Sequence, residues 1–307
     1  MMEGLSAAWD RFFFTPQRMV ALALCRIATG VVTLYCLLLM LPLVEMFFTD
    51  DGWITASQHL ATVFRPDPTF FLITGSPPAL VWAVWVGAIL LSVSLTVGYR
   101  TKATAIILYI VLLSIHERDT FLINGGDLVI RTLVFWLALA PWGGGAALSV
   151  DAWLRERAEP GAAPLEAWGW VQRMIQIQIV MLYLITFSWK LKFDRWHNGS
   201  AIHESMGAVE FVPPGMELML NYPWLTASLT WVVVVTQALL PLCLIWRRSR
   251  PVGFLLGFLL HGWIIVFMRI PVFGLIMWAS YFAFLEEDQA DRIVGWLRRR
   301  GLPTPGT

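Results

Sequence analysis

Charged side chains are scarce in this sequence, since Asp, Glu, Lys and Arg make up only 14% of its 307 residues. A water-soluble domain of similar size carries about a quarter of such residues. Apolar residues reach 58%, and the mean hydropathy is +0.66. This deficit of charge excludes an ordinary soluble domain, and the net charge of +1 gives no support for nucleic acid as a partner. We therefore expect an integral membrane protein whose main surroundings are lipids.

Cysteine and the common catalytic motifs are also rare or missing. The three cysteines lie in apolar runs, their number is odd, and no CxxC pair is present. A disulfide framework and a cysteine-based zinc site are therefore not indicated, and no metal is predicted. The sequence has no HExxH, no phosphate-binding P-loop, no GxSxG and no GxGxxG in a strand–helix context, so proteases, nucleotide enzymes and serine hydrolases have no support.

Long apolar runs are abundant instead. A hydrocarbon core of about 30 Å requires about 20 residues of helix, and that window finds eight runs. They cover residues 19–43, 79–98, 103–116, 128–142, 169–189, 225–246, 252–268 and 271–285. The sequence predicts an all-α, polytopic bundle of about eight transmembrane helices within residues 1–285. The first run is too long for a cleavable signal sequence and is expected to stay as an anchor.

Lys and Arg are distributed unevenly between the connections. One set of alternate connections holds 13 of them and the other holds six, which favours cytoplasmic N- and C-termini in an inner (plasma) membrane. The long outer connections, 44–78 and 190–224, have room for interfacial helices, whereas the inner connection 151–167 is predicted to be a polar linker. Residues 286–307 are predicted to form a cytoplasmic amphipathic helix and a basic tail, with Ile293, Val294 and Trp296 touching lipid.

Two arginines are expected at membrane depth, where an ionisable side chain is unfavourable by roughly 2.5–3.5 kcal/mol. Arg26 lies within the first apolar run, and Arg131 follows Asp127 by one helical turn, so the latter two share a helix face. The charges either form ion pairs that fix the packing or contact a ligand. Both interpretations stay open, and we expect each guanidinium to point into the bundle.

The densest polar stretch between two apolar runs is residues 116–127, HERDTFLINGGD. One interpretation is a turn followed by a helix start, with Gly125 and Gly126 allowing close backbone approach and Asp127 capping the helix. The other is a polar outer loop that presents the titratable His116 to a ligand.

A second polar cluster, SWKLKFDRW at residues 188–196, ends the fifth run. Lys190 and Lys192 cannot face the same way, because two residues turn a helix by about 200°. A lysine at this level either reaches the head groups or, in a dry cavity, becomes a general base. We expect Lys190 to face a cavity shared with His261 and the 116–127 loop, unless Asp194 holds it charged. His261 alone is more often a satisfied packing residue.

Taken together, these segments resemble the HTTM family (horizontally transferred transmembrane domain), whose relatives include the vitamin K-dependent gamma-carboxylases. The residues that carry the resemblance are Arg26, LINGGDLVIR at 122–131, LSVD at 148–151, YLITFSWKL at 183–191, and the histidine of FLLHGW. The similarity runs from about Thr15 to Phe284. The carboxylases are lyases in which a lysine similar to Lys190 is held to deprotonate a reduced quinone.

The resemblance implies a reduced isoprenoid quinone of the menaquinone or vitamin K type as cofactor. Lys190 is then the catalytic base, and the quinone- or substrate-binding residues are Arg26, His116, Asn124, Asp127, Arg131 and His261. The carboxylases have an Asn-His pair where this chain has Asn124-Gly125, and we expect no counterpart of their large luminal domain. We therefore expect quinone-linked modification of a secreted peptide in preference to full glutamate carboxylation.

A second hypothesis is a non-catalytic accessory or immunity-type membrane protein that keeps the bundle without the chemistry. A transporter is less well supported, because no pair of broken helices occurs in two repeated halves. A bound quinone favours the enzyme, and a cavity filled by water or lipid favours the accessory protein.

Overall fold

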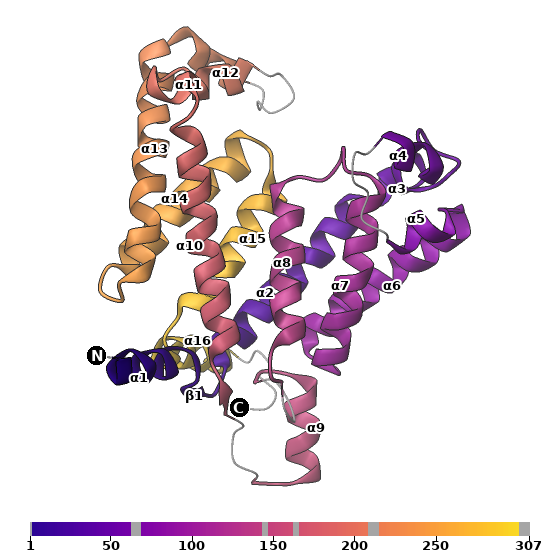
Figure 1. The fold of residues 1–307 in the computed structure, drawn as a ribbon, viewed down its shortest axis with the longest axis vertical. Coiled ribbons are helices and arrows are strands. Elements are labelled where there is room, and N and C mark those ends of the chain that lie inside the picture. The colour runs from indigo at the N-terminus through magenta and orange to yellow at the C-terminus, as the bar shows by residue number, and fades with distance from the viewer. Residues whose placement is uncertain (1, 63–68, 143–146, 162–165, 208–214, 301–307) are drawn as a thin grey trace. The chain divides into compact units, whose positions relative to one another are not determined.

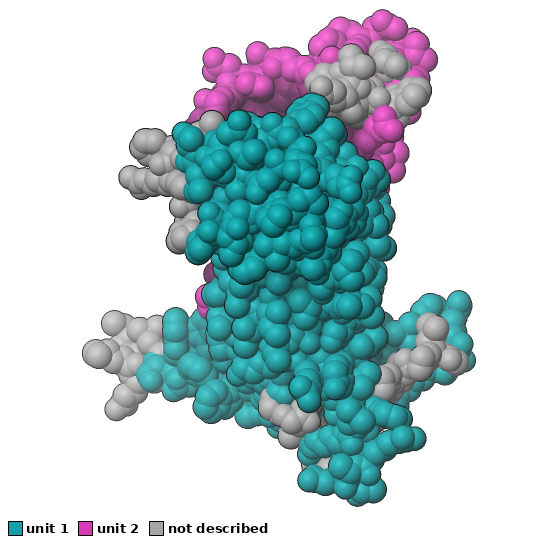
Figure 2. Space-filling view, turned by 90° about the vertical axis from the view of Figure 1, so that its right-hand side faces the viewer, with its two compact units in different colours: residues 1–173, 285–307 teal, residues 174–284 magenta. Residues whose placement is uncertain are grey.

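The computed structural model describes residues 2–62, 69–142, 147–161, 166–207 and 215–300. The described chain is helical except for two short strands, β1 (Pro16–Gln17) and β2 (Ala167–Trp168), which pair antiparallel. It forms two compact units, unit 1 with residues 1–173 and 285–307, and unit 2 with residues 174–284 (Figure 1, Figure 2). The all-α prediction is confirmed apart from the strand pair. A single bundle over residues 1–285 stays a prediction.

Each of the eight predicted apolar runs contains a helix. In chain order they are α2 (Val20–Leu39), α6 (Pro78–Val97), α7 (Thr101–Arg118), α8 (Gly125–Leu139), α10 (Trp170–Lys190), α13 (Pro223–Ile245), α14 (Arg250–Phe267) and α15 (Pro271–Tyr281), which η4 (Phe282–Phe284) extends. Five of them, α2, α6, α10, α13 and α14, are long and apolar enough to cross a membrane. Their outward faces carry exposed apolar side chains such as Leu90 and Leu259, as lipid contact requires.

Unit 1 is built on four helices that run up and down in sequence, α2, α6, α7 and α8. Each packs against its neighbours in a closed ring, α2 on α6, α6 on α7, α7 on α8, and α8 on α2. Gly30 allows the closest approach, because a Cβ there would lie 2.4 Å from Thr96 Oγ1 and 2.9 Å from its amide nitrogen. Small residues at such crossings are typical of membrane helices, where lipid gives no hydrophobic drive for association.

Short helices lie at both ends of this four-helix group (Figure 1). One end carries η1 (Leu41–Leu43), α3 (Val44–Phe48), α4 (Ala56–Thr62) and α5 (Phe70–Thr74), as expected for a long connection with interfacial helices. The other carries α9 (Val150–Ala158). The prediction of a linker at 151–167 is wrong over this part, because Ser149 accepts a hydrogen bond from Ala152 N and caps a helix.

The helix predicted near the C-terminus is α16 (Glu287–Arg299), and α1 (Met2–Phe13) lies at the other end of the chain. α16 packs on α2, and Val294 is buried, so the prediction that Val294 touches lipid is wrong. Arg18 donates a hydrogen bond to the Asp291 carboxylate, which raises the pKa of Arg18. This contact fixes α16 to the beginning of α2. The last part of the predicted tail, residues 301–307, lies outside the described residues.

Unit 2 contains α10 from Met174 onward, followed by α11 (Asp194–His197), α12 (Ala201–Gly207), η3 (Met216–Asn221) and then α13 to η4. α13, α14 and α15 pack in sequence. Gly274 brings α15 against α14, because a Cβ there would lie 2.8 Å from His261 O. The short helices α11 and α12 lie beside the end of α10 that carries Lys190 (Figure 1).

Candidate functional site

A chain of three buried polar side chains crosses the interior of unit 2. The Tyr183 hydroxyl lies 2.7 Å from His261 Nε2 and 2.6 Å from the Tyr281 hydroxyl. The residues come from α10, α14 and α15, and all three are buried. His261 is therefore not isolated on an apolar face, and the structure pairs it with a hydroxyl, as a buried imidazole requires.

This chain has two proton arrangements. If Tyr281 donates to Tyr183 and Tyr183 donates to His261 Nε2, the imidazole carries its proton on Nδ1. If every bond reverses, Nε2 carries the proton and Nδ1 becomes an acceptor. His261 Nδ1 is buried and has no hydrogen-bond partner among the described residues. The hydrogen-bonded series Tyr281–Tyr183–His261 can thus present either a donor or an acceptor at His261 Nδ1.

Gly257 makes room for the Tyr281 phenol. A Cβ at position 257 would lie 2.0 Å from the Tyr281 hydroxyl oxygen. Any larger residue at position 257 would therefore displace the Tyr281 side chain. The glycine is one helical turn before His261, which places the histidine and the open space on the same face. The sequence FLLGFLLHGW therefore encodes both a polar group and the gap that lets a second polar group reach it.

A further polar pair lies one turn along α10. Gln237 Nε2 donates to Thr186 Oγ1 over 2.5 Å, and Thr186 follows Tyr183 by three residues. Gln237 Oε1 and Trp278 Nε1 are buried without a hydrogen-bond partner among the described residues. An unsatisfied buried polar group destabilises a fold by about 1–3 kcal/mol. His261 Nδ1 is the third such atom described in unit 2.

Lys190 lies on the same face of α10 as this polar chain. It follows Thr186 by four residues and Tyr183 by seven, which corresponds to two helical turns and about 10 Å. Its Nζ stands 4.4 Å from the centroid of the Trp196 ring, and it is half-buried, whereas Lys192 is exposed and lies over Trp189. The described residues contain no ion pair between Lys190 and Asp194. The contact with Trp196 stabilises the ammonium form.

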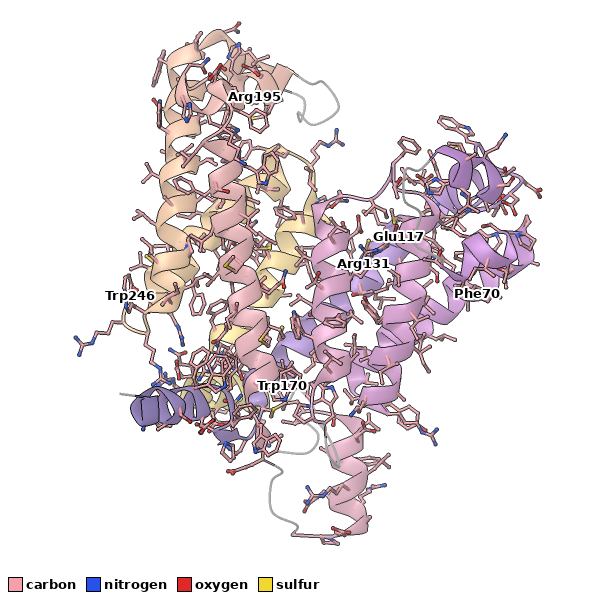
Figure 3. All side chains as sticks on the ribbon, in the orientation of Figure 1. Phe70, Glu117, Arg131, Trp170, Arg195 and Trp246 are labelled. Carbon is pink, nitrogen blue, oxygen red and sulfur yellow. The ribbon has the colours of Figure 1, made fainter. Side chains whose placement is uncertain are left out.

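The polar groups predicted at residues 116–131 meet at one end of unit 1. Arg131 Nη1 donates to Glu117 Oε1 over 2.6 Å, joining α8 to α7 (Figure 3). His116 is only 4% exposed, interacts electrostatically with Arg131, and leaves Nδ1 without a hydrogen-bond partner in the described structure. The prediction that an outer loop presents His116 is wrong, because α7 continues to Arg118 and buries it.

The ion pair that the shared helix face of Asp127 and Arg131 allows does not form in the structure. Asp127 Oδ2 accepts from the backbone N–H of Asn124, whose side chain accepts from Gly126 N, and this capping box turns the carboxylate toward the helix start. Its other oxygen lies 3.2 Å from Cys36 Sγ on α2. Arg131 pairs instead with the Glu117 carboxylate on α7. Asn124 and Asp127 thus begin α8, as the turn interpretation predicts.

Arg26 joins three segments of unit 1. The guanidinium is completely buried and donates to the carbonyls of Leu95, Thr96 (2.9 Å) and Leu148 (2.7 Å). Gly98, at φ +72°, leaves space for it, since a Cβ there would lie 2.7 Å from Arg26 Nη1. The prediction that Arg26 points inward toward carbonyls is confirmed.

Arg26 is distant from the polar groups at residues 116–131. It precedes Cys36, the partner of Asp127, by ten residues, or about 15 Å along α2. Its described contacts are those of a packing residue. A role in quinone binding stays a prediction without a described contact.

The structure therefore gathers the candidate residues into two sets. His116, Asn124, Asp127 and Arg131 lie in unit 1, and Lys190 and His261 lie in unit 2. A cavity shared by both sets stays a prediction. The sequence interpretation missed Glu117, Tyr183, Thr186, Gln237 and Tyr281. The spacing of Tyr183, Thr186 and Lys190 at i, i+3 and i+7 would have revealed a polar stripe at the Lys190 end of α10.

The HTTM domain model matches residues 14–289. The chain belongs to the HTTM family. It is also 26% identical over 132 residues to the sporulation-delaying protein SdpB of Bacillus subtilis (strain 168). That match covers 41% of this chain and 41% of the relative, so it spans well under half the relative's length. No solved structure matches the chain.

Proposed function

We propose that this HTTM protein is a quinone-dependent membrane enzyme that modifies an exported peptide, with Lys190 as the general base. The observation that carries the proposal is the set of unpartnered polar atoms in unit 2, which are His261 Nδ1, Gln237 Oε1 and Trp278 Nε1. A quinone offers two carbonyls as acceptors, and its reduced form offers two hydroxyls as donors. This neutral, mixed donor and acceptor set fits such a ring better than it fits a charged substrate or a metal.

The apolar surroundings of the polar chain also suit an aromatic ligand with an isoprenoid tail. Phe258 stacks on Trp278 with ring centroids 4.8 Å apart, and Phe273 lies edge-on to His261 at 5.4 Å. Aromatic walls with a few convergent polar groups are typical of small-molecule sites. A bound reduced quinone would supply reducing equivalents and an ionisable hydroxyl.

The residues of the chain would hold and move protons around such a ring. His261 Nδ1 would orient one oxygen, and the Tyr183–Tyr281 relay would reset the imidazole after each proton transfer. Lys190, at the end of the same helix face, would accept a proton as the neutral amine. Base function therefore requires Lys190 to leave the Trp196 ring, whose contact favours the charged form.

The quinone content of the protein tests this proposal. The full chain is extracted together with its lipids by an amphipathic polymer, and quinone in the organic extract is measured per mole of protein. We expect about one quinone per chain and a clear loss in Tyr183→Phe combined with His261→Leu. Quinone at the level of an unrelated polytopic protein prepared in the same way would refute the proposal.

The alternative is a non-catalytic accessory or immunity-type protein. The contact between Lys190 and Trp196 favours it, because this arrangement stabilises a charged lysine that needs no chemistry. In that case the interior of unit 2 would hold lipid or water, and the chain would act by binding a partner. The relative's name, sporulation-delaying protein, fits either a modifying or an accessory role.

We also propose eight membrane crossings in the inner membrane, with both termini cytoplasmic. The support is the uneven distribution of Lys and Arg and the eight helices at the predicted positions. α7, α8 and α15 with η4 are shorter or carry more charge than the five long apolar helices, as helices within a bundle can.

This topology predicts that Arg248 faces the cytoplasm. Arg248 is exposed, whereas the neighbouring Ser249 hydroxyl is committed to the carbonyls of Cys243 and Trp246. In a chain with its three cysteines replaced by Ala, Arg248→Cys should resist an impermeant maleimide until the cells are opened. Leu60→Cys, exposed on α4, is the matched control and should be labelled in intact cells. Labelling of Arg248→Cys in intact cells would reverse the orientation.

A further inference from the structure

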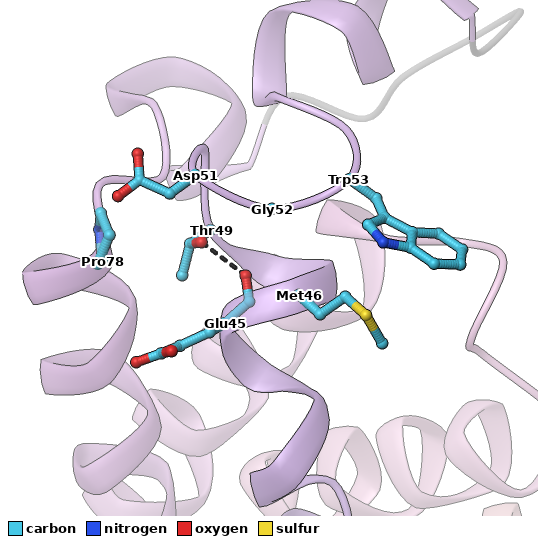
Figure 4. A pocket seen from close by; sticks show the side chains of 7 residues that line it. All are labelled: Glu45, Met46, Thr49, Asp51, Gly52, Trp53 and Pro78. Atoms are coloured by element: carbon cyan, nitrogen blue, oxygen red, sulfur yellow. Dashed lines mark hydrogen bonds between the residues drawn. The ribbon is translucent and has the colours of Figure 1, made fainter.

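A cavity of about 490 Å³ lies at the end of unit 1 where α2 leads into α3. Glu45, Asp51 and Pro78 lie on one side of it, and Met46 and Trp53 lie on the other (Figure 4). Its size is that of a pocket for one or two side chains of a ligand. One wall is acidic and the opposite wall is apolar and aromatic, an asymmetry that the fold does not require.

One wall of this cavity carries the two carboxylates of Glu45 and Asp51. Asp50 lies between these two residues in the sequence, but its carboxylate has structural partners. It accepts hydrogen bonds from Ala56 N and Ser76 N and lies 3.6 Å from Arg118 Nη2. The Glu45 carboxylate accepts a hydrogen bond from Trp82 Nε1 at 3.2 Å. Neither Glu45 nor Asp51 has an ion pair in the described part of the chain. Two carboxylates on one wall attract a cation.

The side chains of the apolar wall are exposed. Trp53 is 73% exposed, although its ring contacts Phe47 at 5.2 Å, and Met46 is exposed as well. An accessible indole face across the cavity from two carboxylates can bind a cationic group through the ring quadrupole. The adjoining apolar atoms of Met46 suit the aliphatic stem of a lysine or arginine, or an apolar neighbour in a peptide. These features favour an organic cation over a metal ion.

The rim of the cavity is rigid. The buried Arg118 donates to Thr49 O (3.0 Å) and Ile54 O (2.7 Å), so one side chain fixes both ends of the turn that carries the lining residues. Trp53 N donates to Met46 O over 2.9 Å. Gly52 has no room for a Cβ, which would lie 2.3 Å from the same carbonyl oxygen. A site formed in advance binds its ligand with a smaller entropic loss.

We propose that this cavity binds a basic side chain of the exported peptide, flanked by an apolar residue, and so recognises the peptide apart from the chemical site. The inference rests on the proposed function for the identity of the peptide. It assigns the charge selectivity to Glu45 and Asp51 and the aromatic contact to Trp53. The four-helix group of unit 1 provides the scaffold, and the polar chain of unit 2 takes no part.

Peptide binding by the full chain in neutral maltoside micelles tests the inference. The probe is acetyl-Leu-Lys-Leu-amide, the neutral control is acetyl-Leu-Gln-Leu-amide, and the dissociation constants come from calorimetry. We expect the lysine peptide to bind at least 10-fold more tightly at low salt and the difference to shrink as salt rises. The double variant Glu45→Gln with Asp51→Asn should remove that preference. Trp53→Leu should weaken binding about 2- to 5-fold.

Two control variants distinguish this cavity from the chemical site and from a general effect of surface charge. Glu159→Gln removes an exposed carboxylate on the α9 side of unit 1 and should leave binding unchanged. Lys190→Met should also leave binding unchanged, so failure of the chemistry and failure of this site give different results. Equal binding of both peptides, or unaltered binding by the double variant, would overturn the inference. Displacement of the peptide by an equal concentration of phosphocholine would also overturn it, by pointing to a lipid head group.

Discussion

Replacing Lys190 by Met is expected to lower the oxygen-dependent oxidation of a reduced naphthoquinone by about 100-fold or more. A positioned general base contributes about 10²–10⁴-fold to such a step, and Met preserves the length and apolar stem of lysine without its amine. The measurement is the absorbance change of the naphthoquinone with the protein in lipid nanodiscs. The spontaneous rate with empty nanodiscs is subtracted.

Lys192→Met is the matched control. Lys192 is exposed, lies in the turn beyond the end of α10 and stands over Trp189, so its loss should change the rate less than about twofold. Both variants should keep the thermal unfolding midpoint of the wild-type protein. A wild-type rate no higher than that of empty nanodiscs, or equal rates in the two variants, would contradict the catalytic assignment.

Replacing Arg26 by Leu is expected to destabilise the protein by about 3–5 kcal/mol. The change leaves the carbonyls of Leu95, Thr96 and Leu148 without their donor inside unit 1, and removing one side of a buried charged contact typically has this effect. The midpoint of thermal unfolding, followed by tryptophan fluorescence, should fall by roughly 10 °C. Arg299→Leu, at an exposed position on α16, should change it by less than about 2 °C.

A second variant keeps this prediction testable if Arg26→Leu does not fold. Gly98→Ala places a methyl group 2.4 Å from Ser149 Cβ and 2.7 Å from Arg26 Nη1 at a positive φ, so it disturbs the same contact without removing the charge. A smaller fall in the midpoint is expected. Wild-type stability of both variants would show that the arginine does not join the three segments.

The sequence predicts the long helices well because their signal is collective. About 20 apolar residues in a row leave few alternatives, and each of the eight runs contains a helix within a few residues of its expected ends. The errors occur where one hydrogen bond decides the outcome. α9 was not expected because the cap formed by Ser149 is a local contact in a polar stretch.

The site was harder to predict for the same reason. Asp127 and Arg131 have the spacing of an ion pair, but the capping box takes the carboxylate, and Glu117 on another helix takes the guanidinium. Tyr183 and Tyr281 each look like ordinary tyrosines of a membrane helix. Only their convergence on His261, across 98 residues of chain, identifies them as one polar group. Spacing within one helix cannot reveal contacts between helices.

A density map of the protein in lipid would show directly whether a quinone lies beside the buried polar side chains of unit 2. We expect a flat ring with one oxygen within hydrogen-bond distance of His261 Nδ1 or Gln237 Oε1, enclosed by the aromatic side chains of α14 and α15. A wild-type map in which only acyl chains or water reach these two atoms would contradict this expectation and favour the accessory protein.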